Sequence, residues 1–500
     1  MSGSAFAVTH HAFSSGAGRT SDGNGSHAST LKSPSYTKSV SWQHYPLHEG
    51  IISVLFKNPI KIIGMCLALF RGKSYFKEYI TQTVTQNADA FCYRYNLIDF
   101  LKSEKRKGRK IHLVTASNQK IADAIGEHLG IFDSVKGSDK NLNLKGLNKG
   151  AFLEEAFPDG FIYAGDHKAD IPIWNAAKGA ILVGKGETYK NSIARNIPQF
   201  VFKDEKVNII KAWIKQLRIH QWAKNILIFI PLFLAHMSTN ADALGKTLLA
   251  FFAFGLIASA TYIINDLADL EADRKHKTKR NRPLASGNIS IFHGLFGALI
   301  LFCIGGTIAL NISAGFTYCI LGYVTLTLYY SFKLKKIPML DVSIIGALFT
   351  LRIIMGSVIN ELPLSPWLNS FSALLFFSLA LAKRHVEILK SEQNTTKIGG
   401  RGYIHQDWPL TLTFGVSSAI CSILVMLIFL TQEAMVQLNY TSPGWLLIEP
   451  ICVFLWVVRI WFLSHRKILS DDPVIFAIKD KTSISLGIIA IISFIIASYC

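Results

Sequence analysis

Cysteine is scarce in this sequence and acidic residues are outnumbered by basic ones, and each shortage excludes a class of protein. The seven cysteines form no CxxC pair. Without closely spaced pairs, we expect neither a disulfide framework nor a zinc site. Asp and Glu number 33 against 52 Lys and Arg, which gives a net charge of +19. The N-terminus has no apolar stretch, so we expect no cleaved signal peptide.

Long apolar runs, by contrast, are frequent after about residue 220. Each approaches the roughly 20 residues that a helix needs to cross a bilayer. The sequence therefore predicts an all-α polytopic membrane bundle of about nine transmembrane helices. The predicted spans are 222–238, 247–264, 289–311, 314–332, 341–358, 366–382, 409–430, 446–465 and 484–500.

The loops between these runs alternate in charge. Lys and Arg concentrate after spans two, four, six and eight, whereas the loops 359–365 and 431–445 contain neither. Basic loops stay on the cytoplasmic side of a membrane. We therefore expect an integral protein of a bacterial inner (plasma) membrane, with the N-terminal region and the four basic loops in the cytoplasm. This pattern explains the net charge, so we expect no nucleic-acid partner.

The residues before the bundle divide into two parts. Residues 1–47 are rich in Ser, Gly, His and Thr and are predicted to be a disordered tail. Residues 48–205 are predicted to form an α/β domain, because the strand-like runs IHLVTAS, FIYAGD and GAILVG alternate with amphipathic segments. The apolar stretch within 48–85 is interrupted by Lys57, Pro59 and Lys61, which favours an amphipathic or capping helix over a span.

Three aspartates follow the second span at spacings of 0, 3 and 7. Asp266, Asp269 and Asp273 would share one face of a helix. Carboxylates this close repel one another unless a divalent cation lies between them, and Mg²⁺ commonly bridges carboxylates to substrate phosphates. Arg280 and Arg282 follow at once, within reach of phosphate oxygens. The pattern predicts a magnesium and phosphate site at the cytoplasmic end of the span.

The segment NDLADLEAD (265–273) followed by RPLASG resembles the first Asp-rich motif of the UbiA superfamily of intramembrane prenyltransferases. The resemblance covers about residues 214–500, which it implies are a transmembrane transferase domain. Within the superfamily the chain is most similar to the polyprenyl-phosphate phosphoribosyltransferases. The segments that carry this similarity are IHQWAKN, YYSFKLKKIPMLDV, LPLSPWL, LALAKRHVEI and DDPVIFAIKD.

One loop separates two possible reactions. The superfamily usually places a second Asp-rich motif between spans six and seven, but here the loop KRHVEILKSEQNTTKIGGRGY contains no Asp. One metal site and a basic surface suit phosphoribosyl diphosphate as the donor and a polyprenyl phosphate as the acceptor. The acceptor would be one of the lipids of the membrane. In the alternative, Glu387 is a second-site acid and a prenyl group passes to an aromatic ring such as 4-hydroxybenzoate. The sequence does not indicate an oligomeric state.

The resemblance implies roles for individual residues. Asp266, Asp269 and Asp273 would bind Mg²⁺, and Asn265 would add an oxygen or orient Asp266. Tyr330, Asp341 and Arg352 are conspicuous polar groups within or beside spans. A transporter would place its intramembrane charges at the bilayer midplane, whereas Asp266, Asp269 and Asp273 lie at one end of a span. The expected phosphate contacts are Lys224, Arg280, Arg282, Lys333, Lys383 and Arg384.

Residues 48–203 resemble the haloacid dehalogenase-like phosphatase fold. The resemblance implies that Thr115 would bind phosphate, that Lys149 (or Lys145) would stabilise it, and that Asp166 and Asp170 would be magnesium ligands. That family needs a DxDxT nucleophile, which should fall near residues 36–40, but these read YTKSV. Without an aspartyl nucleophile the phosphate transfer cannot begin. We expect this domain to lack phosphatase activity.

Overall fold

The structure is a computed structural model, and its elements fall into two compact units. It describes residues 4–8, 36–38, 46–83, 88–91, 93–139, 143–203, 207–391, 401–437, 440–469 and 473–499. The first unit contains residues 1–216 and 266–295, and the second contains 217–265 and 296–500. The chain passes between them within helices α10 (Ala241–Ala268) and α13 (Ile291–Ile312).

The first unit is an α/β fold with a small helical group before it. Its strands are β1 (Ser4–Val8), β2 (Tyr36–Lys38), β3 (Ile111–Asn118), β4 (Ser134–Ser138), β5 (Ile162–Gly165), β6 (Gly179–Val183) and β7 (Gln199–Phe202). Its larger helices are α1 (Pro46–Lys57), α2 (Ile62–Phe70), α3 (Lys73–Thr83), α4 (Tyr95–Arg106), α5 (Gln119–Leu129), α6 (Leu147–Ala156), α7 (Ile171–Ala176) and α8 (Ile209–Leu217).

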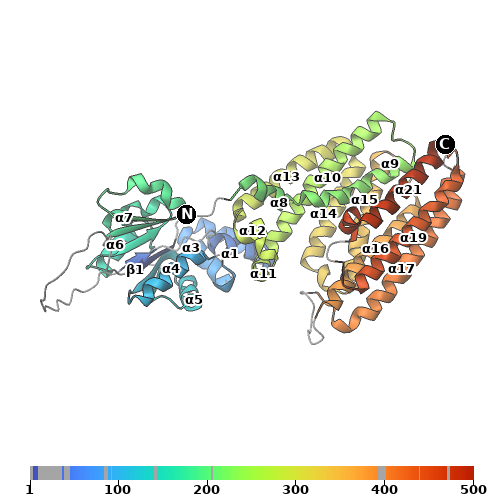
Figure 1. The fold of residues 1–500 in the computed structure, drawn as a ribbon. Helices are drawn as coiled ribbons and strands as arrows, with labels where there is room; N and C mark the ends of the chain where they lie inside the picture. The colour runs from blue at the N-terminus through green and yellow to red at the C-terminus, as the bar shows by residue number, and fades with distance from the viewer. Residues whose placement is uncertain are drawn as a thin grey trace, which may run out of the picture. The chain divides into compact units, whose positions relative to one another are not determined.

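Helices cover both faces of the sheet in this unit (Figure 1). Side chains alternate along each strand, so that Ile162 packs against α4 and α5 while the neighbouring Tyr163 packs against α6 and α7. Helix α5 shows how local sequence sets the boundaries. The Asn118 side chain accepts a hydrogen bond from the Lys120 N–H, and Gly130 ends the helix in the left-handed conformation at φ 60°.

The centre of the sheet departs from the prediction. Strand β1 lies between β3 and β5 and is antiparallel to both, whereas β3–β4, β5–β6 and β6–β7 are parallel pairs. Two short parts of the predicted disordered tail, β1 and β2, are therefore strands, and the other residues of 1–45 lie outside the described part of the chain. The continuous apolar run AFAV suits a strand buried on both faces, but the segment is too short to stand out from its polar surroundings.

The second unit is helical, and among the residues that the structure describes six helices are long and apolar enough to cross a membrane. A helix satisfies all of its backbone hydrogen bonds internally, which is what a bilayer requires. These helices make the chain an integral membrane protein. The six are Ala241–Ala268, Ile291–Ile312, Leu340–Ile359, His405–Ala434, Pro443–His465 and Lys481–Ser498.

Three of the nine predicted spans are not among these six. Helices α14 (Ala314–Phe332) and α16 (Pro366–Leu389) coincide with two of them, but carry more aromatic, hydroxyl or charged residues. The first predicted span, 222–238, is instead the 3₁₀ segment η5 (Ile219–Phe229) and the short helix α9 (Ile230–Leu234). Pro231 lies in the first turn of α9. The total of nine stays a prediction.

Two apolar clusters hold the second unit together. One joins α10, α14 and α15 (Leu340–Ile359), and the other joins α15, α16, α17 (Trp408–Phe429) and α19 (Ile448–His465). Helices α20 (Pro473–Lys479) and α21 (Lys481–Tyr499) complete the described chain. Helix α15 contributes to both clusters, so it lies between the two halves of the bundle and fixes the polar residues that it carries.

Candidate functional site

The three predicted metal ligands do not lie on one uninterrupted helix. Asp266 is in the last turn of α10, which ends at Ala268, and Asp269 precedes α11 (Leu270–Lys275). The turn is almost continuous, because the Asp273 N–H donates to the Asp269 carbonyl at 2.8 Å. Asp266 and Asp273 are buried, and Asp269 is half-buried.

Asp266 and Asp273 converge on a single cation. The Arg282 Nη1 atom lies 3.0 Å from Asp266 Oδ1 and also donates to Asp273 Oδ2. The Gln216 amide donates to the other oxygen of Asp266 at 2.9 Å. Lys279 Nζ is 3.9 Å from Asp273 Oδ1. Two carboxylates that share one guanidinium nitrogen show that this position attracts positive charge.

Burial sets the protonation behaviour of Asp273. It raises the pKa of that carboxyl, Arg282 lowers the pKa, and the negative charge of Asp266 raises it further. Among the residues that the structure describes, no group of three or more His, Cys, Asp or Glu side chains is arranged to hold a metal ion. A divalent ion here would take its remaining ligands from substrate phosphates and water, as Mg²⁺ commonly does.

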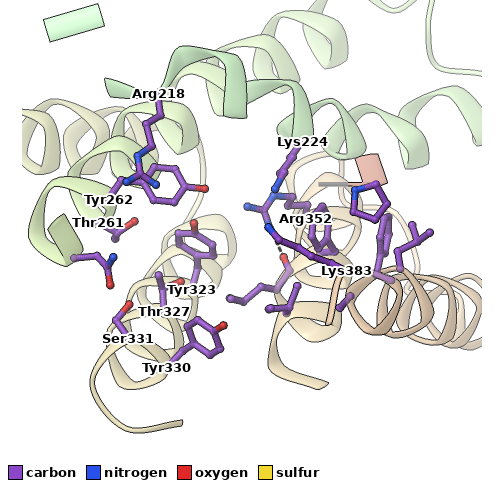
Figure 2. Close-up of a pocket in the computed structure, with 18 of the residues that line it drawn as sticks. Arg218, Lys224, Thr261, Tyr262, Tyr323, Thr327, Tyr330, Ser331, Arg352 and Lys383 are labelled. Carbon is purple, nitrogen blue, oxygen red and sulfur yellow. Dashed lines mark hydrogen bonds between the residues drawn. The ribbon is translucent and has the colours of Figure 1, made fainter. Parts of the chain in front are cut away.

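The second unit contains a pocket of about 270 Å³ between its helices (Figure 2). Four helices line it with side chains that recur every three or four residues, some of them with an adjacent neighbour, which places each set on one side of its helix. The contributions are Thr261, Tyr262 and Asn265 from α10; Tyr323, Thr327, Tyr330 and Ser331 from α14; Ile345, Leu348, Phe349 and Arg352 from α15; and Phe376, Leu379, Ala380, Lys383 and Arg384 from α16.

Segment η5 supplies part of the remaining wall because it is tied to α10. The Trp222 indole N–H donates to the Ser259 hydroxyl at 3.0 Å, and that hydroxyl donates to the Leu217 carbonyl at 2.7 Å. These bonds hold Lys224 and the preceding Arg218 at the pocket. The Arg218 guanidinium lies 5.0 Å from the centre of the Tyr262 ring.

Arg352 is one of two buried cations of the pocket, together with Arg384. It is 5% exposed, and its Nε donates to Asn225 Oδ1 at 3.3 Å. Its guanidinium carbon lies 5.0 to 5.4 Å from the centres of the Phe254, Phe349 and Tyr323 rings. Aromatic faces stabilise a cation without neutralising it. Arg352 thus lies in the interior of the bundle, and its role stays a prediction.

Asp341 fixes two further cations. This carboxylate is fully buried and accepts from Arg384 Nε at 2.8 Å and from the Tyr403 hydroxyl at 2.6 Å, with Arg401 Nη1 at 3.7 Å. Burial raises the pKa of Tyr403, which keeps its hydroxyl protonated as a donor. Arg384 and Arg401 both also pair with Glu387.

The structure therefore gathers part of the predicted set. Asn265, Lys224, Lys383 and Arg384 line the pocket, together with the conspicuous Tyr330 and Arg352. Arg280 is exposed and Lys333 lies over the Tyr329 ring at 5.8 Å, and neither lines the pocket. Arg282 binds the aspartates instead. Sequence analysis missed Arg218 and Arg401, because each looks like an ordinary basic residue beside a span.

Three residues of the phosphatase-like set, Lys149, Asp166 and Asp170, are joined through Tyr163 in the first unit. Lys149, 1% exposed, donates to the Tyr163 hydroxyl at 3.3 Å, and that hydroxyl donates to Asp170 Oδ1 at 2.7 Å. The other Asp170 oxygen accepts from the Asp166 N–H at 3.2 Å. Burial lowers the pKa of Lys149, and the charges of Asp170 and Asp166 partly oppose this. Thr115 is buried and accepts from the Ser117 N–H.

The position that a nucleophile strand would take is held by β1. This strand pairs with β3, which carries Thr115, and with β5, which precedes Asp166, and it contains no Asp. Asp22 lies outside the described residues. The lack of a nucleophile and the haloacid dehalogenase-like assignment both stay predictions.

Comparison with known proteins identifies a family match in the helical unit. Residues 226–478 match the model of the UbiA prenyltransferase family. The uncharacterised protein y4nM of Sinorhizobium fredii is 47% identical over 453 residues, which are 90% of this chain and 88% of y4nM. That similarity includes the N-terminal unit as well as the helical one, because it covers far more than the family match.

Two relatives have names that refer to a process or a reaction. The nodulation protein NoeC of Azorhizobium caulinodans is 30% identical over 288 residues, covering 57% of this chain and 92% of NoeC. Decaprenyl-phosphate phosphoribosyltransferase of Corynebacterium glutamicum is 36% identical over 200 residues. This second match covers 38% of this chain and 59% of that enzyme.

Proposed function

This chain belongs to the UbiA prenyltransferase family, and from that premise we propose that it transfers 5-phosphoribose from phosphoribosyl diphosphate to a polyprenyl phosphate in the membrane. The observation that carries the proposal is the composition of the pocket. Its lining combines a hydroxyl-bearing wall, an apolar wall and six cations. A sugar phosphate and a phosphorylated lipid need all three.

The hydroxyl-bearing wall suits a sugar. Helices α10 and α14 bring together two threonines, a serine, three tyrosines and Asn265, and Figure 2 shows the labelled members of this set on one side of the cavity. Ribose presents hydroxyl groups that need donors and acceptors when water is removed. An aromatic acceptor such as 4-hydroxybenzoate offers fewer hydroxyl groups to this wall.

The opposite wall suits a lipid. Helices α15 and α16 contribute Ile345, Leu348, Phe349, Phe376 and Leu379 to the pocket. Apolar side chains next to polar ones are what a prenyl chain with a phosphate head requires. The lipid phosphate would therefore lie close to Lys383 and Arg384, which belong to the same helix α16 as the last two of these apolar residues.

The charge of the pocket favours two phosphorylated substrates. Arg218, Lys224, Arg352, Lys383, Arg384 and Arg401 line it, and no carboxylate does among the residues that the structure describes. Glu387, the residue that a second metal site would use, pairs with both Arg384 and Arg401. Its charge is thus offset by arginine. This pairing supports a donor with one metal site and an acceptor that is already anionic.

Asp266 and Asp273 are the residues that would hold Mg²⁺. Their convergence on the Arg282 nitrogen fits a cation at this position. Asn265 lines the pocket and Asp266 follows it in α10, four residues after the pocket residue Tyr262. Residues four apart lie on one helix face. When bound, the ion would neutralise charge on the donor diphosphate, and Asp269 is the third carboxylate of the motif.

In the proposed reaction a phosphate oxygen of the lipid forms a bond to the anomeric carbon of ribose. The bond from that carbon to the diphosphate oxygen breaks, and diphosphate leaves with the bonding electrons. The acceptor phosphate is already ionised, so no general base is needed. The protein contributes by positioning the two anions and by stabilising the charge that develops on the leaving group. Arg352 and Lys224 are placed to do this.

Two further lines support the proposal. The similarity to decaprenyl-phosphate phosphoribosyltransferase, at 36% identity, exceeds the 29% identity to the 4-hydroxybenzoate octaprenyltransferase of Pseudoalteromonas translucida. Charge distribution supports a cytoplasmic pocket, since Lys383, Arg384 and Arg401 of the basic stretch between α16 and α17 line it and basic loops stay on the cytoplasmic side. The N-terminal unit would then also be cytoplasmic.

A transfer assay tests the proposal. Purified full-length protein in detergent receives Mg²⁺, radiolabelled phosphoribosyl diphosphate and a polyprenyl monophosphate, and label in the organic phase is measured. We expect lipid-linked label with the native chain. Asp266→Asn should reduce it by roughly 1,000-fold, because a metal-binding carboxylate is lost. EDTA should have the same effect.

The matched control is Asp242→Asn, since Asp242 is an exposed acid at the other end of the same helix α10. It should transfer label at the native rate. Transfer of a prenyl group from a polyprenyl diphosphate to 4-hydroxybenzoate, with no ribose label in the lipid, would overturn the proposal and leave only the family assignment.

A further inference from the structure

Helix α2 in the first unit has an unusually apolar surface. Its nine residues, IIGMCLALF, include no charged or hydrogen-bonding polar side chain. Only Met65 and Ala68 are buried. Ile63 is 73% exposed, Leu67 61% and Phe70 88%, and Ile60 in the preceding turn η1 (Pro59–Lys61) is 90% exposed. Contiguous exposed apolar side chains of this size mark an interaction site.

The helix is nevertheless well anchored on its inner face. Met65 packs with Val54 of α1 and with Phe76 and Tyr79 of α3 in a small apolar cluster. The Tyr79 hydroxyl donates to the Lys61 carbonyl at 3.2 Å, which fixes the start of α2. The exposed apolar side chains are therefore presented outward by a folded three-helix group.

Basic side chains flank the apolar face. Lys61 directly precedes α2 and Arg71 directly follows it, and both are exposed. Arg71 lies 5.4 Å from the centre of the Tyr75 ring and donates to its hydroxyl at 3.3 Å. Apolar residues between cations, with a tyrosine at the edge, are the composition of a helix that lies in the headgroup region of a membrane.

The length of α2 excludes a membrane span. Nine helical residues extend about 14 Å, less than half of the roughly 30 Å of a hydrocarbon core. A bilayer is available to this helix, because the same chain carries six helices that are apolar and long enough to cross one. The anionic lipids of a cytoplasmic leaflet complement Lys61 and Arg71.

We propose that α2, together with Ile60, lies in the headgroup region of an anionic bilayer and anchors the α/β unit to the membrane surface. Ile60, Ile63, Leu67 and Phe70 enter the acyl boundary, and Lys61 and Arg71 contact lipid phosphates. The proposal does not depend on the transfer reaction, since it concerns a surface of the first unit and a lipid that is not consumed.

Lipid quenching in the full chain tests this anchor. Leu67→Cys is made in a background whose seven native cysteines are replaced by alanine, labelled with the fluorophore NBD and reconstituted into nanodiscs of phosphatidylglycerol and phosphatidylcholine. Phospholipids with a nitroxide near the headgroup are then added to the lipid mixture. We expect their quenching of this label to be several-fold stronger than that of a label at Leu147→Cys, which is 73% exposed on α6.

The charge contribution is tested by Lys61→Glu combined with Arg71→Glu, and by nanodiscs of phosphatidylcholine alone. The two substitutions alter exposed residues, so the fold should remain intact. The double substitution and the neutral lipid should each lower the quenching at Leu67→Cys. Equal quenching at the two label positions would overturn the proposal. NBD emission typical of an apolar environment at Leu67→Cys, without nitroxide quenching, would also overturn the proposal. In that case α2 would be covered by protein, either this chain or a second copy, and not by lipid.

Discussion

The two polar clusters of this protein contain similar residue types but differ in what surrounds them. In the first unit, Lys149, Tyr163 and Asp170 bond to one another in the interior. In the second unit, Arg352 and five other cations line a cavity of about 270 Å³. The residue types alone would suggest phosphate binding at both places. Only the second arrangement has both the volume for a ligand and an excess of charge that a ligand would balance.

The comparison also explains why the first cluster is stable without a ligand. A buried cation is costly unless a carboxylate and hydrogen bonds satisfy it, and Asp170 and Tyr163 do this for Lys149. In the second unit, aromatic rings surround Arg352 and leave its charge largely uncompensated. Three substitutions test this difference between the two polar clusters.

Among these three substitutions, Arg352→Met is expected to have the largest effect on transfer. The change removes a buried pocket cation, and the Met side chain fills the space of the apolar part of the arginine. We expect transfer to fall by about 100-fold, as when one electrostatic stabiliser of a developing charge is removed. The measurement is the initial rate of label transfer. Arg466→Met, which removes an exposed cation that follows α19, is the control and should be neutral.

A smaller effect is expected for Tyr330→Phe, which deletes one hydroxyl from the sugar-facing wall. Loss of a single neutral hydrogen bond costs about 1 kcal/mol, so KM for phosphoribosyl diphosphate should rise roughly fivefold. The KM for the polyprenyl phosphate should stay unchanged. An equal rise for both substrates would show that the hydroxyl-bearing wall does not select the sugar.

The smallest effect on transfer, namely none, is expected for Lys149→Met. Here the cost falls on folding, because Asp170 would keep its charge in the interior without its cation. We expect the α/β unit to lose about 3 kcal/mol of stability, seen as faster hydrogen exchange across β5 in the full chain. Lys145→Met, at an exposed position nearby, should change neither property. A large loss of transfer in Lys149→Met at native stability would contradict the contrast between the two clusters.

Much of the helical unit follows from local sequence. The predicted run 314–332 has the bounds of α14, and 289–311 and 341–358 differ from α13 and α15 by at most two residues. Long apolar runs specify membrane helices because burial in lipid depends on composition. The run 222–238 was predicted as one span but does not form one continuous helix. Its first part is η5, which is held by hydrogen bonds that join Trp222 and Leu217 to Ser259, a residue distant from both in sequence.

The candidate site was predicted less completely, for a related reason. Asp266 and Asp273 were expected to bind Mg²⁺ and Arg282 to contact phosphate; their local spacing does bring the three side chains together, but as ion pairs with one another. Arg218 and Arg401 reach the pocket through tertiary packing, which spacing in the sequence does not reveal. In the same way, β1 enters the sheet between strands more than 100 residues later in the chain.

The carboxylate of Asp341 has a consequence for how this protein can vary. It binds Arg384 near the end of α16 and the Tyr403 hydroxyl, so both ends of the segment 385–402 are held at one point of α15. Removing one partner of a buried ion pair leaves the other charge without compensation. A substitution at Asp341 would therefore release Arg384 and Tyr403 together. This one position ties the sequence of α15 to that of α16 and of the residues around Tyr403, so the three can change only in concert.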